Sequence, residues 1–350
     1  MSDIHALISA IPNPVLVIGY DSRIWCANDA ARGLWENDCE GRHYAIILRQ
    51  PALLNTIEKG LAAGGTQNTR YLGNDGARNT TWDVNISALS LEKGQAVLLS
   101  FQDVTALEDA DSMRRDFVGN VSHELRTPLT SLLGFIETLR GPASDDPAAQ
   151  DRFLKIMEQE AGRMHRLVED LLSLSRVEGV ERIRPTTKIS LSALCNEVAE
   201  ALAPVATANN VTLDLDLPES PIHILCDREQ LWQVISNLVE NGVKYGGEGK
   251  TVTLKLTEPA HETLLMQDGI KITVLDQGDG ISEHHIARLT ERFYRVDSHR
   301  SREVGGTGLG LAIVKHIITR HRGRLHVRSK LGQGSEFTVL LPVNASLAEI

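Results

Sequence analysis

The sequence predicts a multidomain α+β protein, and three successive hydrophobic patterns lead to that fold class. Residues 1–105 alternate short apolar runs with turn signals, which is typical of a small sheet. Residues 106–182 space their apolar side chains by threes and fours, as amphipathic helices do. Residues 188–343 alternate helix and strand patterns, which indicates an α/β sandwich. With 350 residues, 42% of them hydrophobic, the chain is long enough for each unit to bury its own core.

The first unit is predicted to be a small antiparallel sheet with helices packed on one side. Residues 15–18 form a buried-strand pattern, and residues 24–25 begin a return strand. An asparagine and an aspartate directly after this hairpin offer a cap for a helix. Later, residues 81–86 alternate polar and apolar side chains, and residues 96–101 form a final strand.

Two long amphipathic helices joined by a short loop are predicted for the second unit. Gly141 and Pro142 break the helical pattern and mark the loop. A single hairpin cannot easily hide its own apolar stripe, whereas two copies can pack as a four-helix bundle, so the pattern favours a homodimer. The apolar positions are Phe117, Val121, Leu125, Leu129, Leu132, Ile136 and Leu139 in the first helix, and Phe153, Ile156, Met164, Leu167, Leu171 and Leu174 in the second.

The octapeptide at residues 121–128 holds the first candidate for chemistry, His123. A neutral imidazole nitrogen is nucleophilic near pH 7, and the carboxylate of Glu124 beside it can take the departing proton. Thr127 lies four residues further on and therefore on the same helical face as His123. Because a lone histidine on a helix is more often an ordinary surface or core residue, this prediction depends on partners elsewhere in the chain.

A polar helical face within residues 237–245 is the second candidate. Asn237 and Asn241 lie one turn apart, and Lys244 follows three residues later. Amide carbonyls are hard oxygen ligands suited to Mg²⁺, and lysine supplies a positive charge to phosphate groups. A solvated helix face or a helix cap would use the same residue types, so this signal is ambiguous by itself.

Three further segments are also ambiguous one by one. Asp276 follows an apolar strand and begins the run Asp-Gln-Gly-Asp-Gly, where its carboxylate could accept a hydrogen bond from an adenine amine or simply form a tight acidic turn. Residues 291–295 mix aromatic and arginine side chains, which suits either ordinary packing or a lid over a nucleotide. Residues 305–311 are rich in glycine and lead into an apolar helix, so their backbone could approach phosphate groups closely.

Charge and cysteine content argue against several classes of function. The chain has a net charge of −10 and a pI of about 5.7, so its negative charge repels nucleic acid and anionic membranes. A protein partner is therefore favoured. The scattered Cys26, Cys39, Cys195 and Cys226 lack the spacing of metal or redox motifs and are expected to be reduced thiols. No apolar run reaches the roughly 18 residues of a membrane helix. We therefore expect a cytoplasmic chain with no membrane segment. It would associate with a membrane only if the native protein had a further segment upstream.

In chain order, the polar helix, the acidic glycine turn, the aromatic segment and the glycine-rich run resemble the N, G1, F and G2 boxes of sensor histidine kinases. The octapeptide around His123 resembles the H box of the same family. The joint resemblance spans residues 112–343, whereas residues 1–105 resemble a PAS sensory domain through less specific motifs. Within the family, residues 289–317 look most like the phosphate-regulon sensor kinases, which usually carry membrane helices that this chain lacks.

The resemblance implies three domains. Residues 1–105 would be a PAS-like sensor, residues 106–182 a signalling helix with the dimerisation and phosphotransfer hairpin, and residues 188–343 a GHKL-type (Bergerat) ATP-binding domain. His123 would be phosphorylated by ATP with Glu124 as the base, and the phosphoryl group would pass to an aspartate on the receiver domain of a response regulator. Thr127 would position water to remove phosphate from that partner, and the likeness within the family implies phosphate-starvation signalling.

ATP and Mg²⁺ are the implied cofactors. Asn241 would hold Mg²⁺, Lys244 and Tyr245 would contact the nucleotide, and Asp276 would read adenine. The other implied nucleotide-binding positions are Asn237, Gly278, Gly280, Gly306, Thr307, Gly308, Leu309 and Gly310.

Two other classes of protein compete with a kinase. An ATPase of the chaperone and mismatch-repair type shares the nucleotide fold. Those proteins have in common a glutamate four residues before the Mg²⁺-binding asparagine, and this chain has Asn237 at that position. A PAS-containing dimeric scaffold with a degenerate kinase domain is the non-enzyme alternative, although every chemically required position is filled. The sequence therefore predicts an ATP-dependent protein histidine autokinase.

Overall fold

Two units divide the chain, Met1–Gly119 and Asn120–Ile350. The computed structural model describes residues 2–35, 39–74, 76, 78–91, 93–180, 184–247, 249–296 and 306–343. The first glycine of the predicted glycine-rich run, Gly305, and the predicted domain edge at residue 182 lie outside the described residues.

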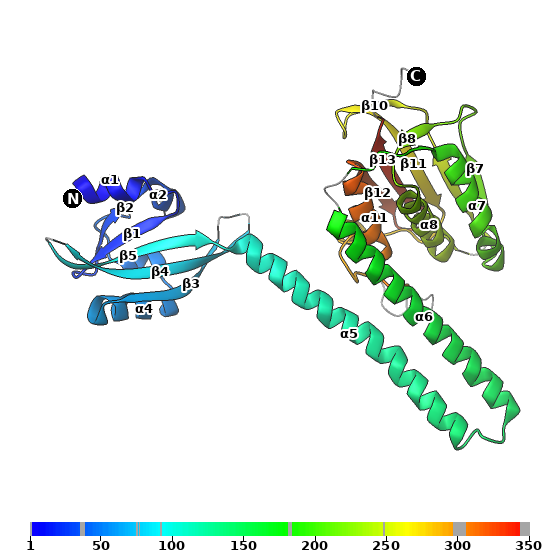
Figure 1. Cartoon of the computed structure of the whole chain (residues 1–350), viewed down its shortest axis with the longest axis horizontal. Helices are drawn as coiled ribbons and strands as arrows, with labels where there is room; N and C mark the ends of the chain where they lie inside the picture. Colours follow the sequence, from blue (N-terminus) through cyan, green and yellow to red (C-terminus); the bar gives the residue numbers. More distant parts are fainter. Residues whose placement is uncertain are drawn as a thin grey trace. The chain divides into compact units, whose positions relative to one another are not determined.

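The first unit is built on one antiparallel sheet in the order β2-β1-β5-β4-β3 (Figure 1). Its strands are β1 Val15–Gly19, β2 Ile24–Ala27, β3 Thr66–Asn74, β4 Asn79–Leu91 and β5 Gly94–Asp103. The predicted strands within β1, β2, β4 and β5 are confirmed, whereas the sequence reading did not identify β3. That strand lies at the sheet edge and keeps mostly polar, exposed side chains, so it lacks a clear apolar alternation.

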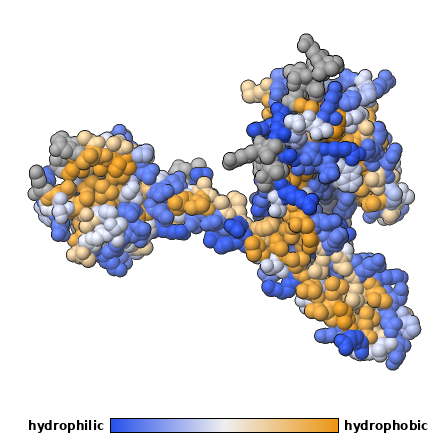
Figure 2. Space-filling view, in the orientation of Figure 1, coloured by the Kyte–Doolittle hydropathy of each residue, from blue (hydrophilic) through white to orange (hydrophobic). Residues whose placement is uncertain are grey.

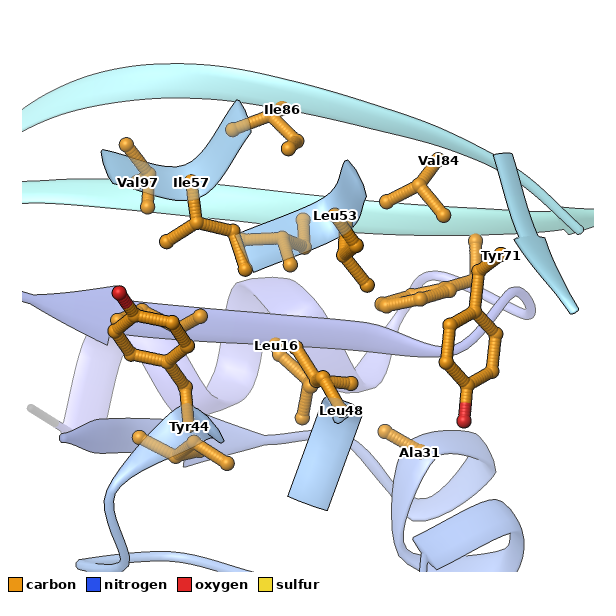
Figure 3. Close-up of a cluster of buried hydrophobic side chains, with 14 of the residues drawn as sticks. Leu16, Ala31, Tyr44, Leu48, Leu53, Ile57, Tyr71, Val84, Ile86 and Val97 are labelled. Atoms are coloured by element: carbon orange, nitrogen blue, oxygen red, sulfur yellow. The ribbon is translucent and has the colours of Figure 1, made fainter. Parts of the chain in front are cut away.

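Helices cover both faces of this sheet, so the predicted packing on one side was wrong. The helices α2 Asp29–Trp35, α3 Tyr44–Leu48 and α4 Pro51–Ala63 contribute to the larger apolar core. In that core the α4 side chains Leu53 and Ile57 lie with Leu16, Val84 and Ile86 (Figure 3).

The opposite face carries a second, smaller core under α1 Ser2–Ser9. There, Ile8 packs with Val15 and Val17 of β1. All five residues of β1 are buried. Because successive side chains of a strand point to opposite faces, a wholly apolar strand needs cover on both.

Helix α5, Thr105–Arg140, and helix α6, Pro147–Val180, form the predicted hairpin. The Asp146 carboxylate caps α6 by accepting from the backbone N–H groups of Ala148 and Ala149, each at 3.0 Å. Phe135 and Phe153 stack across the hairpin with ring centroids 5.3 Å apart. Large apolar side chains nevertheless stay exposed along it (Figure 2), namely Leu129, Leu133, Ile136, Leu154, Val168 and Leu172.

The remainder of the second unit is a two-layer α/β sandwich. Its main sheet has the order β12-β13-β11-β9-β7 with β10 paired to β11, and β7 runs parallel to β9. The strands of this sheet are β7 Thr212–Asp216, β9 Thr251–Leu256, β10 Ala260–Glu262, β11 Gln267–Asp276, β12 Arg324–Lys330 and β13 Gly334–Pro342. A separate pair joins β6 Lys188–Ser190 to β8 His223–Leu225.

Three longer helices make the second layer, α7 Leu191–Ala208, α8 Arg228–Tyr245 and α11 Gly310–Arg320, and α8 contacts both others (Figure 1). A short helix, α9 Glu283–Ile286, follows β11. Cys26, Cys39, Cys195 and Cys226 are buried and form no disulfide with one another. Over the described ranges, no helix combines the length and apolarity needed to cross a membrane.

Buried His321 links two of these helices. Its Nδ1–H donates to the Ile317 carbonyl at 2.8 Å, and its Nε2 accepts from the Asp227 backbone N–H at 3.1 Å. Asp227 is also the N-cap of α8, with its carboxylate accepting from the Gln230 N–H. The neutral imidazole therefore satisfies a donor and an acceptor at the junction of α8 and α11.

Acid is expected to destabilise the sandwich through His321. Burial lowers the pKa of this imidazole below its ordinary value of 6.5. As the pH falls, the unfolded chain therefore binds the proton at a higher pH than the folded chain does. The contribution of His321 to the free energy of unfolding is fully present above about pH 6.5 and decreases as the pH falls below that value. Urea unfolding of the full chain should show a lower midpoint at about pH 5.5 than at about pH 7.5, and His321→Gln should reduce that difference. The same pH dependence in both proteins would contradict this assignment.

Candidate functional site

His123, the predicted phosphoryl acceptor, lies within α5 and is exposed. Thr127, one turn further on, donates from its hydroxyl to the His123 carbonyl oxygen at 3.2 Å. In a regular helix the same carbonyl oxygen also accepts from the Thr127 backbone N–H. Pro128 follows inside the helix and is buried, and its missing N–H leaves the Glu124 carbonyl without its usual partner.

Glu124 forms an ion pair across the hairpin with Arg163 of α6. The Arg163 Nη2 to Glu124 Oε2 distance is 2.9 Å, and the two side chains are 15% and 29% exposed. Within the described hairpin no hydrogen bond joins the Glu124 carboxylate to the His123 ring. The arginine partner was not identified from the sequence, because nothing in local spacing relates residues on two helices.

The polar face of α8 carries four of the predicted residues of the second candidate site. Asn237 and Asn241 are half-buried there, and the Asn237 amide donates to the Gly310 carbonyl at 3.4 Å. Lys244 donates to the Glu240 carboxylate at 2.9 Å. Tyr245, the last residue of the helix, is 39% exposed. Of these α8 residues, Asn237 therefore contacts the start of α11.

Asp276 ends β11 next to this face. Its Oδ1 accepts from the backbone N–H groups of Gly278 at 2.8 Å and Ser335 at 3.2 Å. Burial raises the pKa of the Asp276 carboxyl, although these hydrogen bonds oppose the shift. Ser335 lies on β13, and its contact with Asp276 was not predicted because the two residues are far apart in the chain.

Two predicted glycines are required by close approaches of the backbone. A Cβ on Gly278 would lie 2.2 Å from the Tyr245 carbonyl oxygen. Gly280 has a φ of +70°, and a Cβ there would lie 2.1 Å from the Lys330 carbonyl oxygen. A side chain at position 278 would push the acidic turn away from α8, and one at position 280 would push it away from the end of β12, so the two glycines let the turn pack against both elements.

Residues 306–310 form the loop that leads into α11. Thr307 accepts through its hydroxyl from the Leu309 N–H at 3.3 Å, and Gly308 accepts from the Phe293 N–H at 2.9 Å. Leu309 is buried, whereas Gly306, Thr307, Gly308 and Gly310 are half-buried. The same Thr307 hydroxyl donates to the carboxylate of Asp170 on α6 at 2.6 Å.

The structure thus brings the predicted nucleotide-binding residues of α8, the acidic turn and the glycine-rich loop to one end of the sandwich. Over the described residues, no hydrogen bond or ion pair connects His123, Glu124 or Thr127 with that end. Asp170 was not predicted to belong to the site, because in the sequence it is one polar residue among many on an amphipathic helix.

Comparisons with known families match both candidate sites. The model of the "His Kinase A (phospho-acceptor) domain" matches residues 113–179. The model of the "Histidine kinase-, DNA gyrase B-, and HSP90-like ATPase" matches residues 226–345. A phospho-acceptor hairpin followed by an ATPase-type sandwich defines a class of protein kinases, and the chain belongs to the sensor histidine kinases of that class.

Two relatives make the family assignment more specific. The phosphate regulon sensor protein PhoR of Pseudomonas aeruginosa is 39% identical over 241 residues, which cover 69% of this chain and 53% of that protein. The sensor histidine kinase WalK of Bacillus subtilis is 35% identical over 265 residues, covering 75% of this chain and 42% of that protein. The chain thus spans about half or less of the length of these relatives.

A solved structure has the same fold over nearly the whole chain. The histidine kinase ThkA, crystallised in complex with the response regulator TrrA, aligns over 97% of this chain and 98% of its own, with a TM-score of 0.53. At 20% sequence identity, this likeness supports the fold alone.

Proposed function

We propose that the chain is an ATP-dependent histidine autokinase that phosphorylates His123 and then passes the phosphoryl group to an aspartate of a response regulator. One observation carries the proposal. The side-chain amides of Asn237 and Asn241, Asp276 and the loop at residues 306–310 lie at one end of the sandwich, and the same chain exposes His123 on the hairpin. This arrangement provides a nucleotide site and a separate nucleophile.

In the proposed step a ring nitrogen of His123 attacks the γ-phosphorus of ATP. A nitrogen–phosphorus bond forms, the bond to the bridging oxygen breaks, and ADP leaves with the electron pair. The proton on the other ring nitrogen passes to the Glu124 carboxylate. One oxygen of Glu124 is bonded to Arg163, so the other oxygen is the one available to the imidazole.

The site residues fit a nucleotide bound with Mg²⁺. Asn241 lies one turn before Lys244, and among the described residues its side-chain amide makes no hydrogen bond. Its carbonyl oxygen is therefore suited to hold the metal, which would neutralise phosphate charge when bound. Lys244 and the start of α11 would contact the phosphates, and Asp276 would accept from the adenine amine.

A hydrolytic ATPase is the main competing function, because its proteins share the same family model. Those enzymes need a base to activate water, and the expected position is Asn237. The Asn237 amide donates to the Gly310 carbonyl, and an amide cannot act as a base near pH 7. The side chain therefore favours phosphoryl transfer to His123 over transfer to water.

We further propose that the active protein is a homodimer. The exposed apolar side chains of the hairpin, among them Leu129, Leu133 and Leu172, are the surface that a second copy would cover. The receiver domain of a response regulator would then dock near His123. Neither nucleic acid nor a membrane segment of this chain takes part in the proposed reaction, and the proposed location is cytoplasmic.

The first unit is proposed to be a PAS-type sensor, which the sheet order β2-β1-β5-β4-β3 and the helices around it support. We propose residues 1–105, 106–182 and 188–343 as the sensor, the phosphotransfer hairpin with its signalling helix, and the ATP-binding domain. The relative PhoR supports phosphate signalling as the pathway class.

The proposed activity is tested by incubating the full chain with γ-labelled ATP and Mg²⁺. We expect label on the protein that is lost in acid and retained in base, as for a phosphohistidine. Release of free labelled phosphate from the outset, without labelled protein, would favour the ATPase instead.

Thr127→Ala is expected to separate two activities. Thr127 carries no base, so autophosphorylation should stay within about twofold of wild type, whereas dephosphorylation of the phosphorylated regulator should fall by about tenfold or more. Both rates can be measured with the same purified regulator, and Ser131→Ala, another exposed hydroxyl bonded to a carbonyl in α5, is the control. Equal loss of both activities would instead indicate damage to the helix beside Pro128.

A further inference from the structure

The C-terminal half of α6 is docked against the ATP-binding sandwich. Its side chains Leu174 and Val177 are buried, and α6 packs on α11. The Ser173 hydroxyl donates to the Gln233 side-chain oxygen of α8 at 2.7 Å. Glu178 pairs with Arg292, which precedes the glycine-rich loop. The hairpin that carries His123 is thus attached to the domain that would bind ATP.

Asp170 is the part of this docked face that reaches the glycine-rich loop. Its carboxylate accepts from the Thr307 hydroxyl at 2.6 Å, and the charges of Lys244 and Glu240 act on it. Burial raises the pKa of the Asp170 carboxyl, whereas the Thr307 bond and the Lys244 charge oppose that shift. The Asp170 carboxyl group therefore lies among the groups to which the proposed function assigns the phosphates.

A nucleotide would need the same surroundings. Phosphate oxygens are acceptors that would use the Thr307 hydroxyl, the Lys244 ammonium and the N–H groups at the start of α11. A carboxylate and a triphosphate close together in a half-buried site repel each other strongly. Both can be present only if α6 moves away from the loop or if Asp170 takes up a proton.

We propose that Asp170 occupies, within its own chain, part of the site for the nucleotide phosphates, so that ATP binding and release of α6 from the glycine-rich loop are coupled. This inference rests on the proposed function, because it takes residues 306–310 and Lys244 as the phosphate end of an ATP site. In the docked state the carboxylate competes with ATP, and loss of its bond to Thr307 removes the contact that holds α6 directly to the glycine-rich loop.

The test compares nucleotide affinities of the full chain by calorimetry. Asp170→Asn keeps an acceptor for Thr307 but removes the charge, and it should bind ATP with Mg²⁺ about threefold to tenfold more tightly than wild type. Adenosine, which has no phosphates, should bind both proteins equally. The control is Glu169→Gln, which removes an equal charge from the neighbouring, exposed position. Unchanged ATP affinity in Asp170→Asn, or equal tightening for ATP and adenosine, would overturn the proposal.

One further variant and the wild-type result separate this inference from its premises. Ser173→Ala loosens the docked face without touching the phosphate end, so it should change ATP affinity by less than Asp170→Asn does; an equal change would mean that docking, and not charge, controls binding. If wild type binds ATP but Asp170→Asn changes nothing, the proposed function stands and the inference fails. If wild type binds no ATP, the proposed function itself fails.

Discussion

Replacing His123 with alanine is expected to reduce labelling of the full chain by γ-labelled ATP to background. The imidazole supplies the nitrogen to which the phosphorus would bind, and alanine has no nucleophile. Nucleotide affinity should stay within about twofold of wild type, because His123 makes no hydrogen bond or ion pair with the described residues of the ATP site. Labelling by gel autoradiography and affinity by calorimetry check the two parts separately.

His165→Ala is the matched control for this result. His165 is also an exposed histidine of the hairpin, with 73% of its side chain accessible, and it lies one turn before Glu169 on α6. It should retain full labelling. Label that persists in His123→Ala, or that survives acid in the wild type, would show that another residue is the acceptor.

Asn241→Ala should cause the second large effect, a loss of nucleotide affinity in Mg²⁺ of about tenfold or more, equivalent to about 1.4 kcal/mol. The variant removes an oxygen ligand that hard cations prefer, without changing the charge of the site. The difference from wild type should shrink when the metal is chelated. Autophosphorylation should fall at least as far as binding does.

Asn196→Ala controls for the loss of an asparagine from the sandwich. Asn196 lies on α7, and its amide donates to the Ser192 carbonyl at 3.2 Å, away from the predicted site. Its ATP affinity should match that of wild type. An Asn241→Ala protein that binds ATP normally in Mg²⁺ would remove Asn241 from the metal site.

Much of the candidate site could be predicted because its signals are local. The spacing of Asn237, Asn241 and Lys244 places them on one face of a helix whatever that helix packs on. The positive φ of Gly280 is a property of the acidic turn itself, so a glycine at this position is a local signal. The two long helices and the loop between them follow from apolar periodicity and a breaker, which are also properties of neighbouring residues.

The contacts that set the state of the site depend instead on residues far apart in the chain. No spacing rule relates Glu124 to Arg163, or Asp170 to Thr307, because each pair joins elements whose distance is decided by packing. The cover of α1 over the second face of the first sheet escaped prediction for the same reason, whereas β3 was not predicted because its own residues lack an apolar alternation. The sequence by itself therefore determined most of the elements, the order of the units and the residue types of the site, since these depend on local conformation and hydrophobic pattern. Only the tertiary structure decided that the hairpin docks on the ATP-binding sandwich with Asp170 against the glycine-rich loop, since burial and long-range pairing act between segments that the chain connects only distantly.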